Sequence, residues 1–242
     1  MHVELLDHVR QNTIGRMPNW NKIQSELPSP VPPKLLEYAQ RHGSTRSRMS
    51  FAEYHLHNLE ALYTSTGPQD ESDAADRTLA EVHSVVFSLD SALDSLAYEL
   101  NLVYQLGVPA SSTHIFHEHS RFMPECVRCH LDSMSDPVTS YLETELSMAW
   151  FGVFLKLRSQ IACKNLPIIK VDFRTTETPG QTIHRTLLTL PNDPSNASPR
   201  STDYSMNLEA NQYCEETIDR VRHVIEGVYP LIEPKVRKIY TV

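Results

Sequence analysis

The chain has 242 residues, a hydrophobic content of 40% and a formal net charge of −8. This length is enough for one large or two small domains with a buried core, and the composition disfavours a disordered chain. The negative charge disfavours non-specific adhesion to DNA or to anionic membranes, so RNA is a possible but disfavoured partner that would need a local basic patch.

The N-terminal segment, MHVELLDHVRQNTIG, does not have the character of a signal peptide. It contains Glu4 and Asp7 and lacks a basic start followed by a continuous apolar stretch. Nowhere does the sequence approach the roughly 20 consecutive apolar residues that a membrane span needs. We therefore expect a cytoplasmic protein whose four cysteines are thiols or metal ligands rather than a disulfide framework.

Prolines divide the chain into its expected elements. Residues 1–33 are expected to form an N-terminal arm that ends in a proline-rich, polyproline-type connector. Residues 34–242 are expected to form one helical domain. Because proline interrupts helix interiors, four long helices are predicted in four proline-free windows, 34–67, 69–108, 138–166 and 200–229.

The first two windows carry helical apolar patterns. In the first, the predicted stripe consists of Phe51, Tyr54, Leu59, Leu62 and Tyr63. In the second, apolar residues recur at steps of three and four, which predicts a long helix with an apolar seam. The seam consists of Leu79, Val82, Val86, Leu89, Leu93, Leu96, Leu100 and Val103. The sequence Gly107-Val108-Pro109 is expected to end this helix.

The third window opens with Asp136 before Pro137, a favourable N-cap and first-turn pair. Residues 148–157 are apolar on nearly every side, which predicts a central and largely buried helix. The fourth window again steps by four and three, through Cys214, Ile218, Val221, Ile225 and Val228. We expect Cys163 and Cys214 to be buried and inert, because both lie in apolar helical settings.

Between the third and fourth windows the apolar period changes to two. Ile169, Val171 and Phe173 alternate with charged residues, ETPG follows as a turn, and QTIHRTLLTL alternates again. This pattern predicts a β-hairpin at about residues 167–190, inserted into an otherwise helical domain. The segment PNDPSNASPRSTD is expected to be a loop.

The connector between the second and third windows is rich in potential metal ligands, including a Cys-x-x-Cys-His pattern. The ligands are His114, His117, His119, Cys126, Cys129 and His130. The Cys-x-x-Cys-His pattern fits a covalent haem, but such attachment belongs to exported proteins and no export signal is visible. Zinc fits better, since two thiolates and two imidazoles complete a tetrahedral site that would order the connector. A catalytic metal and ordinary loop residues are the remaining interpretations.

Other chemistry finds little support in the sequence. The Glu-x-x-His motif of di-iron bundles is absent, as are the glycine-rich phosphate loops and the Gly-x-Ser-x-Gly nucleophile motif. Polar residues on the first two helices are expected to make solvated or interhelical contacts rather than to bind metal. They are Glu53, His57, Glu60, His83, Asp90 and Asp94.

The stretches FAEYHLHNLEALY and HSVVFSLDSALDSLAYELNLVYQLGV resemble the long antiparallel helix pair of the HEPN-like superfamily of helical bundles. The resemblance covers about a third of the chain. Active HEPN ribonucleases have an Arg and a His four to six residues apart, and Arg77 and His83 match that spacing. The resemblance then implies that Arg77 positions a phosphate and that His83 is a general base. However, this pair stands early in its helix, unlike the family pattern, which favours an inactive member.

Together these features predict a mainly α protein built on an antiparallel bundle of four long helices. An irregular His/Cys-rich connector and an inserted β-hairpin interrupt the bundle. The main functional hypothesis is a non-catalytic interaction or scaffolding module that forms a homodimer. The alternatives are an HEPN-type, metal-independent ribonuclease and a zinc-binding protein that uses residues 114–130.

Overall fold

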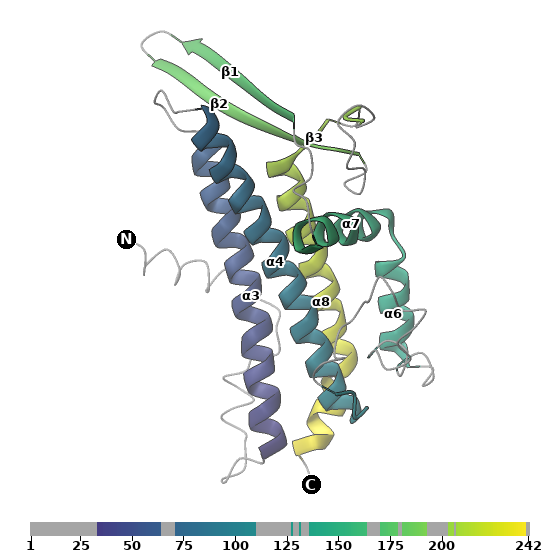
Figure 1. Ribbon diagram of the computed structural model, residues 1–242. Coiled ribbons are helices and arrows are strands. Elements are labelled where there is room, and N and C mark those ends of the chain that lie inside the picture. The colour runs from purple at the N-terminus through teal and green to yellow at the C-terminus, as the bar shows by residue number, and fades with distance from the viewer. Residues whose placement is uncertain are drawn as a thin grey trace. The chain divides into compact units, whose positions relative to one another are not determined.

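The computed structural model of the chain is mainly helical and contains a small antiparallel sheet (Figure 1). The structure describes residues 33–63, 71–109, 127, 131, 136–163, 170–178, 181–192, 203–205 and 207–240. The predicted N-terminal arm lies outside the described residues, apart from Pro33. All six potential zinc ligands of the connector lie outside them as well.

The chain divides into two compact units, and long helices contribute to both. The first unit takes in residues 1–50, 89–148 and 220–242, and the second takes in residues 51–88 and 149–219.

Helix α3 (Pro33–Tyr63) begins at the last proline of the predicted connector, a residue whose missing N–H costs nothing in a first helical turn. The stripe expected on it is only partly correct. Leu59 is fully buried, but Phe51 is 45% exposed. The side that is buried follows a different set of positions, with polar residues among them: Tyr38, His42, Thr45, Met49 and Ala52. Because the buried side includes the polar residues His42 and Thr45, the spacing of apolar residues alone did not predict it.

Helix α4 (Glu71–Tyr104) confirms the predicted seam. From Val82 to Val103 each of the expected seam residues is buried, while Leu79 is half-buried. The helix ends as predicted before Gly107, which has a φ of 70°, although Gln105 already adopts a left-handed φ of 53°. Asn101 fixes the turn, because its amide accepts from the backbone N–H of Val108 at 3.1 Å and donates to the carbonyl of Val108 at 2.8 Å.

The third window holds two helices rather than one, α6 (Pro137–Leu146) and α7 (Ala149–Cys163). Asp136 caps α6 as predicted and accepts from the backbone N–H of Val138 at 3.0 Å. The interruption falls at Ser147, whose hydroxyl donates to the carbonyl of Thr144 at 3.0 Å. Such side-chain bonds to the backbone compete with the continuation of a helix.

Helix α7 is not the all-round buried helix that its composition predicts. Phe151, Phe154 and Leu157 are buried on one side, whereas Gly152 and Lys156 are exposed. The apolar residues of this helix predicted burial on all sides, but other parts of the chain cover only one of its faces.

Helix α8 (Ala210–Tyr240) confirms the predicted apolar steps, and all five seam residues are buried. Its predicted end is wrong, because the helix continues through Pro230 and Pro234. Both prolines are exposed and lie one turn apart on the same side, where water can satisfy the carbonyls that lose their partners.

In the first unit, α6 approaches α8 closely at a glycine. The hydroxyl of Tyr141 donates to the carbonyl of His223 at 2.9 Å. A Cβ atom at Gly227 would lie 2.0 Å from that hydroxyl oxygen. The absence of a side chain at Gly227 therefore makes this contact possible.

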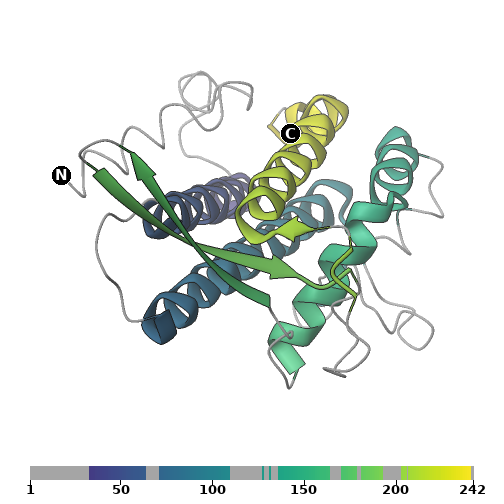
Figure 2. The same ribbon diagram turned by 90° about the horizontal axis from the view of Figure 1, so that it is seen from above.

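The second unit contains the predicted hairpin. Strands β1 (Lys170–Thr178) and β2 (Gln181–Leu190) pair antiparallel, with Lys170 opposite Thr189 and Thr178 opposite Gln181. The short strand β3 (Leu208–Glu209), which the sequence did not predict, pairs with the end of β2 and leads directly into α8 (Figure 2).

None of the helices within the described ranges is suited to crossing a membrane. Each lacks the combination of length and apolar character that spanning a bilayer requires.

Candidate functional site

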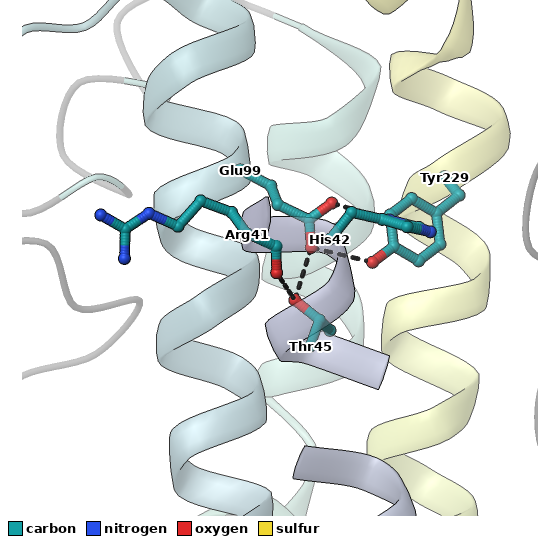
Figure 3. Close-up of polar contacts among 5 residues, drawn as sticks. All are labelled: Arg41, His42, Thr45, Glu99 and Tyr229. Atoms are coloured by element: carbon teal, nitrogen blue, oxygen red, sulfur yellow. Dashed lines mark hydrogen bonds and ion pairs between the residues drawn. The ribbon is translucent and has the colours of Figure 1, made fainter. Parts of the chain in front are cut away.

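The most unusual polar feature of the described chain is a buried carboxylate in the first unit. Glu99 on α4 has an exposed fraction of 0%. His42 and Thr45, three residues apart on α3, face it from one side, and Tyr229 on α8 faces it from another (Figure 3). Residues three apart in a helix lie on the same face, so α3 presents two polar groups to one acceptor.

Each oxygen of the Glu99 carboxylate is used. Oε1 accepts from the Thr45 hydroxyl at 2.5 Å and from the Tyr229 hydroxyl at 3.0 Å. Oε2 lies 3.1 Å from Nδ1 of His42. The Thr45 hydroxyl also lies 3.3 Å from the carbonyl of Arg41, but its single proton favours the shorter contact to the carboxylate (Figure 3).

The electrostatics of the cluster keep the Tyr229 hydroxyl protonated. Burial, and then the negative charge of Glu99, raise the pKa of Tyr229 well above its usual value. Tyr229 therefore stays a hydrogen-bond donor at any physiological pH. An ionised carboxylate can only accept hydrogen bonds. The contact between ionised Glu99 and His42 is therefore a hydrogen bond when Nδ1 of His42 carries a proton.

Aromatic rings enclose the imidazole. The ring of Tyr38 stacks on His42 at a centroid distance of 5.9 Å, and the ring of Tyr229 meets it edge-on at 5.0 Å. Next to them, the guanidinium of Arg41 lies 4.5 Å above the ring of Tyr98. The imidazole is thus held in one orientation by both hydrogen bonding and packing.

A carboxylate that orients a histidine is also the supporting half of many general-base sites. Here, however, the exposed fractions are 3% for His42, 0% for Thr45 and 1% for Tyr229. A substrate would have to displace packed helices to reach any of these groups. The arrangement is therefore suited to fixing three helices relative to each other rather than to catalysis.

A second polar cluster in the first unit lies around Asp136. Its carboxylate accepts from the Tyr104 hydroxyl at 2.6 Å and from the Lys235 ammonium. The ammonium also lies 4.6 Å from the centroid of the Tyr104 ring. Burial by itself raises the pKa of Asp136, but the bonds from Lys235, Tyr104 and the Val138 N–H outweigh it and lower the pKa. The cluster joins the start of α6 to the C-terminal parts of α4 and α8.

The structure places the two predicted catalytic residues, Arg77 and His83, on the same regular helix. Six residues on α4 correspond to a rotation of about 120° and a rise of about 9 Å. The Arg77 side chain is 59% exposed and lies 3.7 Å from the carboxylate of Asp73. Burial lowers the pKa of His83, and its Nε2 atom is buried without a hydrogen-bond partner in the described structure.

A polar contact between α3 and α4 is made by residues next to the expected ones. In the second unit His55, rather than His57, reaches across to α4, where its Nδ1 lies 2.7 Å from the carboxylate of Glu81. Asn58 donates to the same carboxylate at 3.4 Å. His57 stays on its own helix, 3.9 Å from Glu60.

No metal centre is present in the described part of the chain. Within it, there is no group of three or more His, Cys, Asp or Glu side chains placed to hold a metal ion. The six predicted zinc ligands lie outside that part, but Val127, between Cys126 and Cys129 in the sequence, and Leu131, directly after His130, are helical and buried. Cys214 is buried as predicted, and burial raises its pKa to about 12.

Sequence reasoning missed both Glu99 and His42. Glu99 lies inside an apolar stripe between the buried residues Leu96 and Leu100. A charged residue within a predicted buried face is a signal that could have identified it. His42 gave a weaker signal, since it stands beside Arg41 in a segment that has the composition of a solvated surface.

Comparisons with known proteins add no further identification. The chain matches no protein-family model, no curated protein and no solved structure.

Proposed function

We propose that this protein is a non-catalytic helical interaction module of the HEPN-like type. In this proposal four long helices form an antiparallel bundle, the His/Cys-rich connector links the second and third helices, and the protein acts in the cytoplasm as a homodimer. The elements α3, α4, α6 with α7, and α8 would supply the four helical parts.

The main observation in support of the proposal is that the polar groups of the Glu99 cluster are closed off from solvent. Its acid, its imidazole and its two hydroxyls are directed at one another and are shielded from solvent. A module whose helices have a structural role needs such internal contacts, whereas an enzyme needs reactive groups in a concave and accessible site.

Exposed aromatic side chains give further support. Phe87 on α4 is 56% exposed and Phe51 on α3 is 45% exposed, and both belong to the second unit. Both helices already bury an apolar face, so these two side chains are not needed for the core. In this proposal the two side chains belong to one apolar patch, since contiguous exposed apolar patches are typical of surfaces that contact other proteins.

The test combines the mass of the purified protein with an RNA-cleavage assay. Light scattering after size exclusion should give the mass of a dimer, and RNA should remain intact in the presence of the protein. RNA cleavage that is lost in Arg77→Ala but kept in Arg48→Ala, an exposed arginine on α3, would overturn the non-catalytic proposal. A monomer at all concentrations would overturn the homodimer.

A metal-independent ribonuclease is the second candidate, and the environment of His83 favours it. The lowered pKa of His83 keeps its imidazole neutral near pH 7, as a general base requires. Arg77 would hold a phosphate oxygen in this mechanism. The candidate is weaker because the two residues point in directions about 120° apart on α4 and Arg77 lies beside Asp73.

Zinc binding by the 114–130 connector is the third candidate. Val127 lies between two of the proposed ligands in the sequence and Leu131 follows the last of them, and both are buried, so in this proposal the metal would lie next to packed structure. Elemental analysis of the purified protein should then give about one zinc per chain. A value below about a tenth of this, in a normally folded protein, would remove the candidate.

A further inference from the structure

The β-hairpin of the second unit has strand edges without a neighbouring strand. Strand β1 pairs with β2 along its whole length, whereas β3 pairs only with Thr189 and Leu190 at the end of β2. The sheet order is β1-β2-β3, so β1 is an outer strand. Among the described residues no strand pairs with its outer edge (Figure 1).

One end of the hairpin is anchored, and toward the turn β1 is exposed on both faces. Residues 187–190 of β2 are buried. Toward the turn, Thr176 and Glu177 are both exposed, and successive residues of a strand point to opposite faces. A two-stranded ribbon is only marginally stable in water, and an open edge is a template for another strand.

We propose that β1 pairs antiparallel with β1 of a second copy, so that the segment Lys170–Thr176 forms a continuous sheet across a two-fold axis. The proposal rests on the homodimer of the proposed function and specifies which surface the second copy contacts. A homodimer with a two-fold axis normal to the sheet has the same segment on both sides of the interface.

Charge and the length of paired strand together select the register. When a two-fold axis runs normal to the sheet, one residue of β1 lies opposite the same residue of the second copy. Each possible register has a different residue at this central position. With Phe173 at the centre, Asp172 of each copy lies opposite Arg174 of the other, and an aromatic residue faces its equivalent. Centring on Asp172 or on Arg174 instead sets like charges opposite each other, which is unfavourable. Centring on Val171 would also set Lys170 opposite Asp172, but it would pair only residues 170–172 of β1, whereas centring on Phe173 pairs residues 170–176.

The rest of the hairpin supports the choice of β1 over β2. In β2 the only residues that can carry charge are His184 and Arg185, and no acidic residue is available, so no register of β2 against itself gives opposite charges. Within the chain, the Cα partner of Asp172 is Leu187 and that of Arg174 is Arg185. Asp172 already binds Lys170 at 2.8 Å, so in the dimer its carboxylate would lie between two cations.

A charge exchange tests this interface in the full-length protein. Asp172→Arg and Arg174→Asp each place like charges opposite each other twice, and each should weaken the dimer by at least about tenfold in Kd. The double variant, Asp172→Arg with Arg174→Asp, should restore the dimer. Glu177→Arg is the matched control, because it makes the same charge change as Asp172→Arg on the same strand but outside the paired segment.

Masses from light scattering across a dilution series give the readout, and circular dichroism confirms that each variant is folded. If both single variants and the control remain dimers, the β1 interface is wrong while the proposed homodimer stands. Failure of the double variant to recover the dimer, although folded, also overturns the register. A wild-type protein that is monomeric throughout overturns the homodimer of the proposed function together with this interface.

Discussion

A buried carboxylate such as Glu99 is stable only where hydrogen-bond donors replace the water that it loses on folding. Thr45, Tyr229 and His42 supply these donors from two other helices. Removal of the carboxylate would leave all of these groups buried without their acceptor, and each unsatisfied donor costs about 1–3 kcal/mol.

We therefore expect Glu99→Ala to lower the free energy of unfolding by about 3 kcal/mol or more. Glu99→Gln should cost less, because its amide oxygen can still accept from Tyr229 and Thr45. Glu143→Ala, at an exposed site on α6, is the control. Urea unfolding gives the three values, and a Glu99→Ala variant as stable as the control would contradict the account of the cluster.

A second residue-scale prediction concerns Gly227. A methyl group there would collide with Tyr141, so Gly227→Ala should lower the Tm even though alanine favours helices. Gly43 lies in a helix of the same unit, and a Cβ atom added there would meet nothing within 4 Å. Gly43→Ala should instead stabilise the protein by about 0.5–1 kcal/mol. Calorimetry of the two variants should give shifts of opposite sign, and equal shifts would refute the close contact.

At the scale of single elements, the start of α6 depends on the charge of Asp136. The folded pKa of this group lies below its usual value of 3.8. Its ionised form therefore contributes stability above that pH, and the contribution is lost as the pH falls through the lower, folded pKa.

Asp136→Asn keeps a good N-cap but removes the charge that Lys235 binds. We expect it to lower the free energy of unfolding by about 1 kcal/mol at pH 7. The difference from wild type should shrink as the pH is lowered below 3.8. Urea unfolding at a series of pH values measures it, and a difference independent of pH would show that the charge has no such role.

Sequence reasoning succeeded for elements whose signal is local. The seam of α4, the N-cap of α6 and the alternating pattern of β1 and β2 each depend on residues close together in the chain. It failed where the outcome depends on surroundings. The apolar residues of α7 did not reveal that one face is open to solvent, and Pro230 did not end α8 because its side of the helix is exposed.

For the molecule as a whole, the candidate site could not be predicted because its residues are distant in sequence. His42 and Glu99 are 57 residues apart, and Glu99 and Tyr229 are 130 residues apart. Nothing in the local pattern around any of them indicates the other two. Only the packing of three helices brings them together.

The same long helices link the two compact units, since α3, α4 and α8 each contribute residues to both. We expect the units to unfold together in one cooperative transition, because melting one would fray helices shared with the other. Far-ultraviolet circular dichroism and the fluorescence of Trp150, in a Trp20→Phe background, should give coincident curves. Separate midpoints would show that the units are thermodynamically independent.

The Glu99 cluster also fixes the alignment of the helices along their axes. Apolar seams tolerate sliding, because one leucine fills much the same space as the next. A slide of one helical turn between α3 and α4 would carry His42 and Thr45 about 5 Å from the carboxylate and place an uncompensated charge against apolar side chains. The cluster thereby penalises every misaligned pairing of these helices, as a single buried polar residue does in coiled coils.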